Sequence, residues 1–276
     1  MNARRSLLFV PGSRPERFGK ALAAGADMVC VDLEDAVAPA HKAEARTSAL
    51  PFLTDTPGPE RLVRINSVKS AEGLRDLLAV IDARPSGGSL MLPKVDHAEE
   101  VRWAAALLTE AGLCLSLVAL VETAEGLENA AAIAASSPFL KAVMFGGADL
   151  SAELGTPLAH EPLLYARSRL VHAAARAGIE AIDVPHIDVS DLEACRAETE
   201  TARSLGFTAK ACIHPTQVAV VNGVFTPGPE EVARARRIVE ALEANPHGVL
   251  LLDGKLVEKP VVRAAQRVLA RAQQSH

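Results

Sequence analysis

The sequence is short of aromatic residues and has no long hydrophobic run. Its 276 residues include seven Phe, one Trp and one Tyr, although 49% of them are hydrophobic. Helices with small, closely packed faces fit this composition. No apolar stretch approaches the roughly 20 residues that a membrane-spanning helix needs. The first apolar run, Ser6–Val10, is too short for a signal peptide, so we expect no contact with a membrane.

The chain also lacks closely spaced cysteines and an excess of positive charge. Its four cysteines stand far apart, and three lie in apolar, strand-like runs, which is typical of reduced thiols in a cytoplasmic protein. The net charge of −5, without a basic stripe, argues against a nucleic-acid partner. No H-E-x-x-H, G-x-x-x-x-G-K-[ST] or G-x-G-x-x-G motif is present, which argues against zinc, P-loop and dinucleotide sites.

Short apolar runs alternate with longer Ala-rich amphipathic segments along most of the chain. Such alternation predicts a parallel sheet covered on both faces. Eight units within roughly 215 residues favour an α/β fold of the (β/α)₈ TIM-barrel type over an open sheet. The expected strands are Ser6–Val10, Met28–Leu33, Arg61–Asn66, Ser89–Pro93, Leu115–Glu122, Ala142–Gly147, Glu180–Val184 and Thr208–His214.

The C-terminal part of the chain holds more elements than a barrel needs. A helix is expected from the Pro227–Glu231 start to about Ala244, and a second helix from Pro260 to Gln274. Asp253-Gly254 between apolar runs predicts a hairpin. We therefore expect a barrel core over residues 1–225. Residues 226–276 are expected to form the last barrel helix plus a C-terminal hairpin–helix extension that packs on a neighbouring subunit.

Polar side chains interrupt the expected strands near their C-terminal ends. Catalytic residues of a TIM barrel lie at that face, so six or more ionisable groups are expected to converge there. The polar residues at these ends are Asp32, Glu34, Asp35, Arg64, Asn66, Lys94, Glu122, Asp149, Asp183, Lys210 and His214.

Glu122 and Asp149 follow two very apolar neighbouring strands. Two carboxylates held close together repel unless a cation or a shared proton relieves them. Mg²⁺ fits, because it prefers oxygen ligands and keeps waters that a substrate can replace. The preceding glycines, Gly146 and Gly147, allow the backbone to approach a bound carboxylate. The alternative is that both acids cap the helices that follow them.

Arg64 is the candidate for stabilising a negative charge in this region. A guanidinium pairs with a carboxylate or an enolate oxygen in a planar fork. A salt bridge to Glu34 or Asp35 is compatible with that role, and these two acids are candidates for holding waters on the metal. Lys94 offers a Schiff-base alternative, although crowding by carboxylates favours its charged form. His214 fits a structural strand-end histidine better than a base.

The turn after the first strand offers a place for an anion. Pro11-Gly12-Ser13 leads into a helix start that carries Arg14 and Arg17. Backbone N–H groups, helix dipole and guanidinium act together at such a position. This pattern is compatible with a small phosphorylated ligand.

Several of these motifs, in this order, resemble the citrate lyase beta-subunit-like family of the HpcH/HpaI aldolase and malyl-CoA/citramalyl-CoA lyase superfamily. The resemblance covers nearly the whole chain. The matching segments are Ser6–Ser13 with Arg17, Asp32–Val37 with Lys42 and Arg46, Arg64–Asn66, Leu92–Lys94, Val121–Thr123 with Gly126, Phe145–Leu150, Ala181–Asp183, Gly206-Phe207, Ile213–Pro215 with Gln217, and Asp253–Lys255.

The resemblance implies a homotrimer, or a multiple of three, with Mg²⁺ bound by Glu122 and Asp149. It implies that Arg64 steadies a thioester enolate. Gly147 and Ala148, together with Arg64 and Asp149, are the implied substrate contacts. Arg14, Arg17 and Lys42 are the implied contacts of coenzyme A.

The resemblance also implies a catalytic acid/base in the C-terminal hairpin, supplied by the neighbouring subunit. Relatives carry an aspartate there, and Glu258 stands in its place, one methylene longer. Because misplacement by about 1 Å costs on the order of 100-fold in rate, this position bears directly on activity.

The implied function is Mg²⁺-dependent carbon–carbon lyase activity. A 3-hydroxyacyl thioester such as (S)-citramalyl-CoA or malyl-CoA is cleaved to acetyl-CoA and a 2-oxoacid, or formed from them by Claisen condensation. The alternatives are a citryl-acyl-carrier lyase subunit within a citrate lyase complex, a free-acid pyruvate-type class II aldolase, and a degenerate barrel that serves binding or assembly.

Overall fold

A computed structural model describes residues 4–244, 250–252 and 255–274 of the chain. The chain divides into two compact units, Arg4–Asn222 and a second one that starts at Gly223. Within the described residues, no helix combines the length and the apolar character that crossing a membrane requires.

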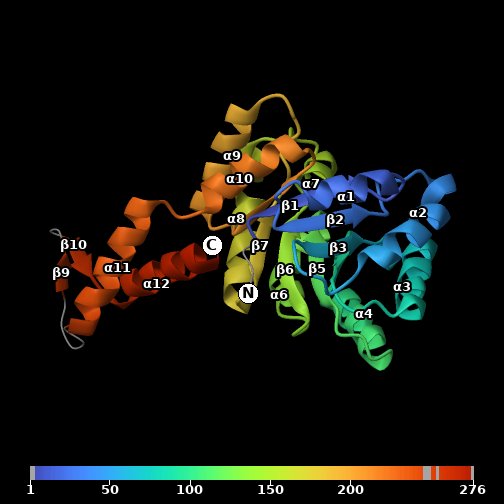
Figure 1. Ribbon diagram of the computed structural model, residues 1–276, viewed down its shortest axis with the longest axis horizontal. Coiled ribbons are helices and arrows are strands. Elements are labelled where there is room, and N and C mark those ends of the chain that lie inside the picture. The colour runs from blue at the N-terminus through green and yellow to red at the C-terminus, as the bar shows by residue number, and fades with distance from the viewer. Residues whose placement is uncertain (1–3, 245–249, 253–254, 275–276) are drawn as a thin grey trace. The chain divides into compact units, whose positions relative to one another are not determined.

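The first unit is a closed barrel of eight parallel strands, as expected from the alternating pattern (Figure 1). Each strand pairs with the next, and β1 also pairs with β8, with Leu7 opposite Ala211. Observed and expected strand ends differ by no more than two residues. The strands are β1 Ser6–Pro11, β2 Met28–Asp32, β3 Glu60–Arg64, β4 Ser89–Leu92, β5 Ser116–Val121, β6 Leu140–Phe145, β7 Glu180–Asp183 and β8 Ala209–Cys212.

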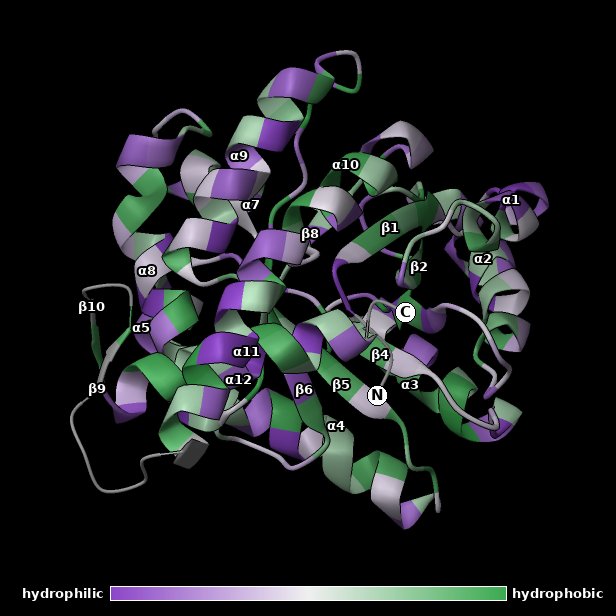
Figure 2. Ribbon diagram, turned by 60° about the vertical axis from the view of Figure 1, so that its left-hand side comes forward, coloured by the Kyte–Doolittle hydropathy of each residue, from purple (hydrophilic) through white to green (hydrophobic). Residues whose placement is uncertain are grey.

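Helices and short 3-10 turns connect the strands on the outside of the barrel. Figure 2 shows mainly hydrophobic strands and helices of mixed hydropathy, the pattern of a sheet covered by amphipathic helices. The connections are η1 Pro15–Arg17 and α1 Phe18–Leu22; η2 Pro39–His41, α2 Lys42–Ala49 and η3 Leu50–Phe52; α3 Ala71–Ala83; α4 Ala98–Glu110; α5 Ala124–Glu128 and α6 Ala130–Ala134; α7 Gly147–Glu153 and α8 His160–Ala177; and α9 Leu192–Leu205.

The connection between β5 and β6 consists of two short helices, α5 and α6, because the helix is interrupted at Asn129. The Asn129 side chain donates to the carbonyl of Asp96 at 2.9 Å and to Oε1 of Glu125 at 3.0 Å. Asparagine competes with helix formation through such local bonds.

The helix that follows β8 is α10, Pro215–Phe225, and not the 229–244 segment that we expected to be the last barrel helix. Proline at a first helical position is a start signal. The Gln217 side chain accepts from the backbone N–H groups of Ile213, at 3.0 Å, and His214, at 3.3 Å, which fixes this start. The boundary between the compact units falls within α10, after Asn222, rather than after residue 225.

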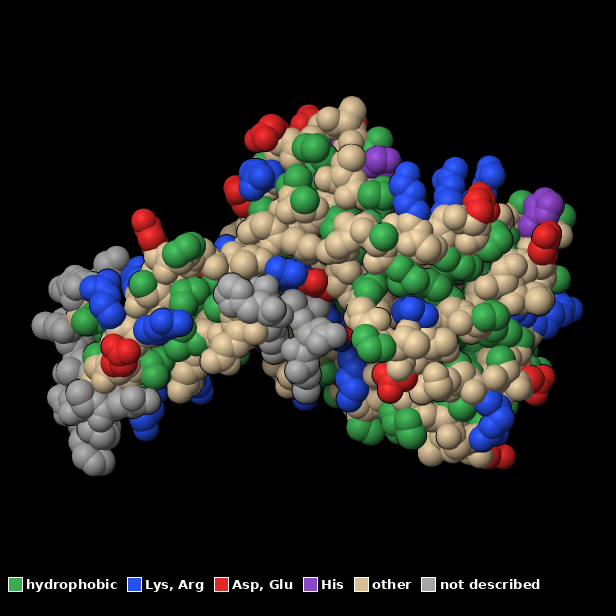
Figure 3. Space-filling model, in the orientation of Figure 1, with side chains coloured by type: hydrophobic (Ala, Val, Ile, Leu, Met, Phe, Trp, Pro, Cys, Tyr) green, Lys and Arg blue, Asp and Glu red, His purple; other side chains and the backbone are tan. Residues whose placement is uncertain are grey.

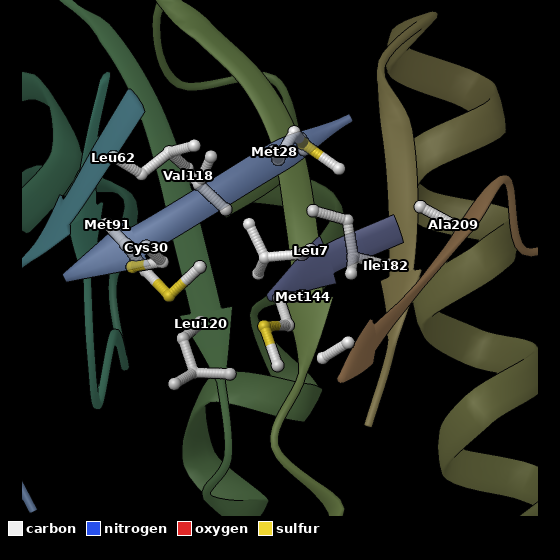
Figure 4. Packing of buried hydrophobic residues seen from close by; sticks show 12 residues of the cluster. Leu7, Met28, Cys30, Leu62, Met91, Val118, Leu120, Met144, Ile182 and Ala209 are labelled. Carbon is white, nitrogen blue, oxygen red and sulfur yellow. The ribbon is translucent and has the colours of Figure 1, made fainter. Parts of the chain in front are cut away.

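Alternate residues of the strands fill the barrel interior. Figure 4 shows side chains from different strands directed toward one common core. Three of the four cysteines are buried and all four are unpaired, in line with the expectation of reduced thiols. The interior cluster consists of Leu7, Met28, Cys30, Leu62, Met91, Val118, Leu120, Ala142, Met144, Ile182, Ala209 and Ala211, with Phe9 packed against it.

Asp183 and Lys210 lie one residue away from interior positions, so they point between the barrel and its helices. Lys210 is fully buried and donates to Asp183 at 2.7 Å and to the carbonyl of Val184 at 2.7 Å. Arg167 of α8 donates to the same carboxylate at 3.1 Å. This network joins β7, β8 and α8.

The second unit holds α11 Pro229–Ala244, β9 Leu250–Leu252, β10 Lys255–Val257 and α12 Lys259–Gln274. The two strands pair antiparallel, as expected for a hairpin, with Leu252 opposite Lys255. The expected turn residues, Asp253 and Gly254, lie outside the described residues. Ile238 and Ala235 of α11 pack with Val257, Val262 and Ala265 in a small core of this unit.

Replacing Lys210 by Met is expected to lower the free energy of unfolding by about 3 kcal/mol, because the buried carboxylate of Asp183 loses one of its two cationic partners and keeps only Arg167 among the residues described. Urea denaturation of the purified variant measures the loss. Lys141→Met is the control, since Lys141 is exposed and, in the part of the chain that the structure describes, donates to the carbonyl of Pro138. Equal stability of the two variants would show that the buried pair contributes nothing.

Candidate active site

A cavity of about 440 Å³ opens at the C-terminal ends of the barrel strands. Its walls combine charged groups from β2, β3, β5 and the β6–α7 turn with apolar side chains. A volume of this size accommodates a small organic acid. The lining residues are Phe9, Val10, Pro11, Asp32, Asp35, Ala36, Arg64, Leu120, Glu122, Met144, Phe145, Gly146, Ala148, Asp149, Val184, Pro185, Ile187 and Ile213.

The structure brings Glu122 and Asp149 together, as the sequence predicted. Glu122 directly follows β5 and is 2% exposed, whereas Asp149 lies in the exposed first turn of α7. Burial raises the pKa of the Glu122 carboxyl to about 8, with help from the nearby charge of Glu34 and a hydrogen bond with Asp149. A buried carboxyl in contact with a second acid therefore keeps its proton near neutral pH unless a cation replaces it.

Gly146 is required for the position of Glu122. A Cβ atom at residue 146 would lie 2.1 Å from Cβ and 2.9 Å from Oε2 of Glu122, so any side chain there displaces the carboxylate. Glu122 is also held by the backbone N–H of Lys94, which donates to Oε1 at 2.8 Å. Residue 146 thus sets how closely the β6–α7 turn approaches the acid.

The donor set fits a divalent cation that binds through oxygen. Glu122 and Asp149 provide carboxylates on one wall of the cavity. Among the residues that the structure describes, no group of three or more His, Cys, Asp or Glu is arranged to enclose an ion. Two protein carboxylates leave several coordination positions to water and substrate. Mg²⁺ is commonly bound in proteins in this way.

Arg64 is held by an acid that the sequence analysis did not single out. Asp32 accepts from Nε and from Nη2 of Arg64, both at 2.7 Å, in a bidentate pair. Burial opposes the charge of Arg64, but the hydrogen bond to Asp32 and the attraction of nearby acids outweigh it and raise the pKa. The guanidinium also lies 5.3 Å from the centre of the Phe9 ring. Arg64 is therefore a fixed, permanent charge in the cavity wall.

Asp32 was recognisable in principle from strand alternation. Met28 and Cys30 face the barrel interior, so Asp32 at the end of the same strand faces it too. Asp32 also accepts from the backbone N–H groups of Glu34, at 2.9 Å, and Ala36, at 3.1 Å. It orders both the arginine and the loop that follows β2.

Glu34 and Asp35 engage cationic side chains rather than forming an isolated acid pair. Glu34 is 6% exposed and pairs with Lys94 Nζ; its Oε2 lies 3.0 Å from Arg64 Nη1 without hydrogen-bond geometry. Asp35 is exposed and lies 3.5 Å from the same nitrogen. Burial raises the pKa of Glu34, and the two cations oppose that shift.

Lys94 does not have the surroundings of a Schiff-base lysine. Burial opposes its charge, but its hydrogen bond and ion pair with Glu34 prevail and raise the pKa. The amine therefore stays protonated and is a poor nucleophile. Its backbone has φ +52°, an uncommon conformation for a residue with a side chain.

Asp183, Lys210 and His214 do not join the group in the cavity. The first two face outward from the barrel and pair with each other. His214 is exposed, and its Nδ1 lies 2.8 Å from Oγ1 of Thr216 at the start of α10. The structural role expected for His214 agrees with this position.

A second cavity, of about 380 Å³, lies beside the turn after β1. Gly12, Ser13 and Arg14 line it, together with residues of η2 and α2. The side chains of Arg14 and Arg17 are more than half exposed, and Lys and Arg side chains gather over α1 in the upper right of Figure 3. Arg17 and Lys42 do not line this cavity, and Lys42 instead binds protein oxygens.

Glu258 lies between β10 and α12 in the second unit and is exposed. The Glu258 carbonyl accepts from the N–H of Val262, and this bond closes the first turn of α12. The hairpin before it and the helix after it thus define its local position.

Two family models match this chain. One, described as HpcH/HpaI aldolase/citrate lyase, matches residues 5–215, and another, described as a C-C bond lyase of the TIM-barrel fold, matches residues 169–275.

The similar proteins include enzymes named for acyl-CoA substrates. The human mitochondrial citramalyl-CoA lyase is 34% identical over 98% of this chain and 85% of its own length. A (3S)-malyl-CoA thioesterase of Cereibacter sphaeroides is 38% identical over 98% of this chain and 94% of its own. A crystal structure of the protein CitE from Mycobacterium tuberculosis, in complex with magnesium, acetoacetate and coenzyme A, has a TM-score of 0.82. It is 38% identical and covers 98% of both chains.

These matches span the barrel, the rim that carries Glu122, Asp149 and Arg64, and the C-terminal unit. The chain therefore belongs to the HpcH/HpaI aldolase/citrate lyase family.

Proposed function

We propose that this protein is a Mg²⁺-dependent carbon–carbon lyase of a 3-hydroxyacyl-CoA thioester. The reaction yields acetyl-CoA and a 2-oxoacid, or runs in reverse as a Claisen condensation. The observation that carries the proposal is the contact between Glu122 and Asp149 beside the fixed charge of Arg64. The citramalyl-CoA lyase relative and the magnesium and coenzyme A complex of the M. tuberculosis protein support the substrate and the metal.

The metal-binding acids and the first turn of α7 have different roles in the proposed reaction. Glu122 and Asp149 bind the metal, which when present acts as a Lewis acid on the substrate hydroxyl and carboxylate oxygens. The backbone of Gly147 and Ala148, in the first turn of α7, offers N–H groups to the substrate carboxylate. The acid/base, assigned below to Glu258 of a neighbouring subunit, takes the hydroxyl proton as the carbon–carbon bond breaks. The electron pair of that bond passes to the thioester, which becomes an enolate.

Arg64 stabilises the thioester enolate that this cleavage creates. A preorganised cation in a partly buried site lowers the energy of a developing negative charge more than one in water does. Asp32 keeps the guanidinium in one orientation, so little reorganisation accompanies the reaction. Protonation of the enolate carbon then completes acetyl-CoA.

We assign that protonation to Glu258 of a neighbouring subunit in a homotrimer. Support comes from the resemblance that places an acid in the C-terminal hairpin and from the exposure of Glu258. A symmetric ring supplies one such residue to each site.

We also propose a cytoplasmic location, which the four unpaired cysteines support.

Thioester hydrolysis is a second candidate activity, because one relative is named as a (3S)-malyl-CoA thioesterase. Hydrolysis breaks the carbon–sulfur bond and releases free thiol, whereas the lyase reaction releases a 2-oxoacid. Assays of malyl-, citramalyl-, methylmalyl- and citryl-CoA that follow both products distinguish the two. An acyl-carrier thioester in the same panel tests the citrate lyase alternative.

Glu122→Gln and Asp149→Asn are each expected to lower Mg²⁺-dependent cleavage by more than about 100-fold, because loss of a metal carboxylate removes several kcal/mol of stabilisation. Turnover and calorimetric Mg²⁺ binding measure the effect. Glu99→Gln is the control, since Glu99 is exposed on α4 and its ion pair within the described residues is with Arg102. Wild-type turnover in either test variant would refute the proposed function.

The metal-free protein is expected to lose stability as the pH rises toward 8. An unfolded Glu loses its proton near pH 4.3, whereas folded Glu122 has a pKa of about 8. Between these values the folded state binds the proton more tightly, so stability falls with rising pH. Because Mg²⁺ replaces that proton, the increase in Tm on adding Mg²⁺ is expected to grow from about pH 5.5 to about pH 8.5. The increase becomes independent of pH in Glu122→Gln; persistence of the trend in that variant contradicts the assignment.

A mixing experiment tests whether Glu258 acts across a subunit boundary. Inactive Glu258→Gln and inactive Glu122→Gln chains, refolded together in equal amounts, are expected to recover about a quarter of the wild-type activity, because that fraction of sites combines both intact residues. Glu258→Asp alone is expected to stay active. No recovery in the mixture, with each variant still trimeric, contradicts a shared site.

A further inference from the structure

Lys42, at the start of α2, uses its ammonium entirely within the protein. Its Nζ donates to the carbonyl of Leu33 at 2.9 Å, to the carbonyl of Glu34 at 2.9 Å and to Oδ1 of Asn66 at 2.6 Å. A lysine has three N–H donors, so these three acceptors saturate it. No donor is left for a phosphate of coenzyme A in this arrangement.

The partner of Lys42 is itself held by a buried acid. Asp76 of α3 is 1% exposed and accepts from the backbone N–H of Asn66 at 2.8 Å and from its Nδ2 at 2.7 Å. Arg46 of α2 donates to the same carboxylate at 2.5 Å. Asn66 Nδ2 also lies 3.1 Å from the carbonyl of Leu33. Two helices thus fix the amide that orients Lys42.

Close packing leaves this segment no room to relax. A Cβ atom at Gly73 of α3 would lie 2.0 Å from the carbonyl oxygen of Ser67 and 2.6 Å from that of Asn66. The helix therefore presses directly on the chain that carries Asn66. In such close packing, a shift of one hydrogen-bonded group displaces its partners as well.

The carbonyls that Lys42 holds belong to the loop that positions the catalytic arginine. Leu33 and Glu34 follow Asp32, the bidentate partner of Arg64. The N–H of Leu33 donates to the carbonyl of Arg64 at 2.9 Å, and the Glu34 side chain pairs with Lys94. Movement of this loop displaces Arg64 and both of its acidic neighbours together.

We propose that Lys42 is a positioning residue of the lyase, which clamps the Asp32–Asp35 loop through Leu33, Glu34 and Asn66, and is not a contact of coenzyme A. The inference rests on the proposed function only for its kinetic consequence. It replaces the role that the family resemblance suggested for this lysine. The geometry needs one compact ammonium at the meeting point of three oxygens.

Lys42→Met and Lys42→Arg separate the clamp from a phosphate contact. Arginine keeps the charge, but its planar fork cannot direct three donors to three converging oxygens from one nitrogen. Both variants are expected to lower kcat by about 100-fold, since misplacement of Arg64 by about 1 Å has that effect. The KM for the CoA thioester is expected to stay within about threefold. Lys141→Met is the matched control, with unchanged kcat and KM.

Two measurements do not depend on turnover. The calorimetric Kd for free coenzyme A is expected to be the same in wild type, Lys42→Met and Lys42→Arg. Hydrogen exchange at the amides of Leu33, Glu34 and Ala36 is expected to be faster in both variants, because their bonds to Arg64 and Asp32 loosen. Unchanged exchange at these amides overturns the clamp.

A phosphate contact gives the opposite kinetic pattern. A raised KM and a weaker Kd for coenzyme A in Lys42→Met, both restored in Lys42→Arg with kcat unchanged, would overturn the proposal. If the wild-type protein cleaves none of the thioesters tested, the lyase assignment fails. Hydrogen exchange and coenzyme A affinity then still decide the role of Lys42.

Discussion

The site depends on the crowding of acids around too few cations. Asp32, Asp35, Glu122 and Asp149 line the cavity. In the described part of the chain, these acids and the neighbouring Glu34 are opposed by two cations, Arg64 and Lys94. Arg64 is shared between the acids at the end of β2. Lys94 attracts Glu122, but burial and the neighbouring acids outweigh that attraction. Burial and the neighbouring acids raise the pKa of Glu122 to about 8, so its carboxyl holds a proton until a divalent cation takes the place of that proton. The excess of acids also raises the pKa of Lys94, so its amine stays charged.

Strand alternation decides which polar residues take part. The barrel was predictable from the repeated apolar runs, and Glu122, Asp149 and Arg64 were predictable from their places after those runs. Asp183 and Lys210 also end apolar strands, but they have the opposite parity to Ile182, Ala209 and Ala211, so they point outward. Parity counted along each strand separates Arg64 and Glu122 from Asp183 and Lys210. Asp149 lies beyond its strand, in the first turn of α7, where strand parity does not apply.

Tertiary contacts account for what the sequence left open. The pairing of Arg64 with Asp32, rather than chiefly with Glu34 or Asp35, depends on the register of β2 with β3, which puts the two residues opposite each other. The commitment of Lys42 to three oxygens depends on Asn66 and Asp76, far away in sequence. No local pattern contains either fact. Likewise, the helix after β8 was misassigned because Pro215 starts a helix directly behind a strand-end histidine.

The groups at the cavity are held first by the buried strands and then by the loops that follow those strands. Buried strands fix the ends that carry Asp32, Arg64 and Glu122. Gly146 allows the β6–α7 turn to bring Asp149 to Glu122, and Asp76 with Lys42 holds the loop after β2. The groups at the cavity therefore rely on supporting residues for their positions, which is how a rigid barrel holds flexible side chains in place.

Anomalous diffraction from crystals soaked in Mn²⁺, a spectroscopic substitute for Mg²⁺, tests the central claim most directly. The account predicts one strong peak in the barrel, within about 2.5 Å of a carboxylate oxygen from Glu122 and from Asp149, on the side that faces Arg64. A cavity without a peak at saturating Mn²⁺, or an ion held by other residues, would contradict it.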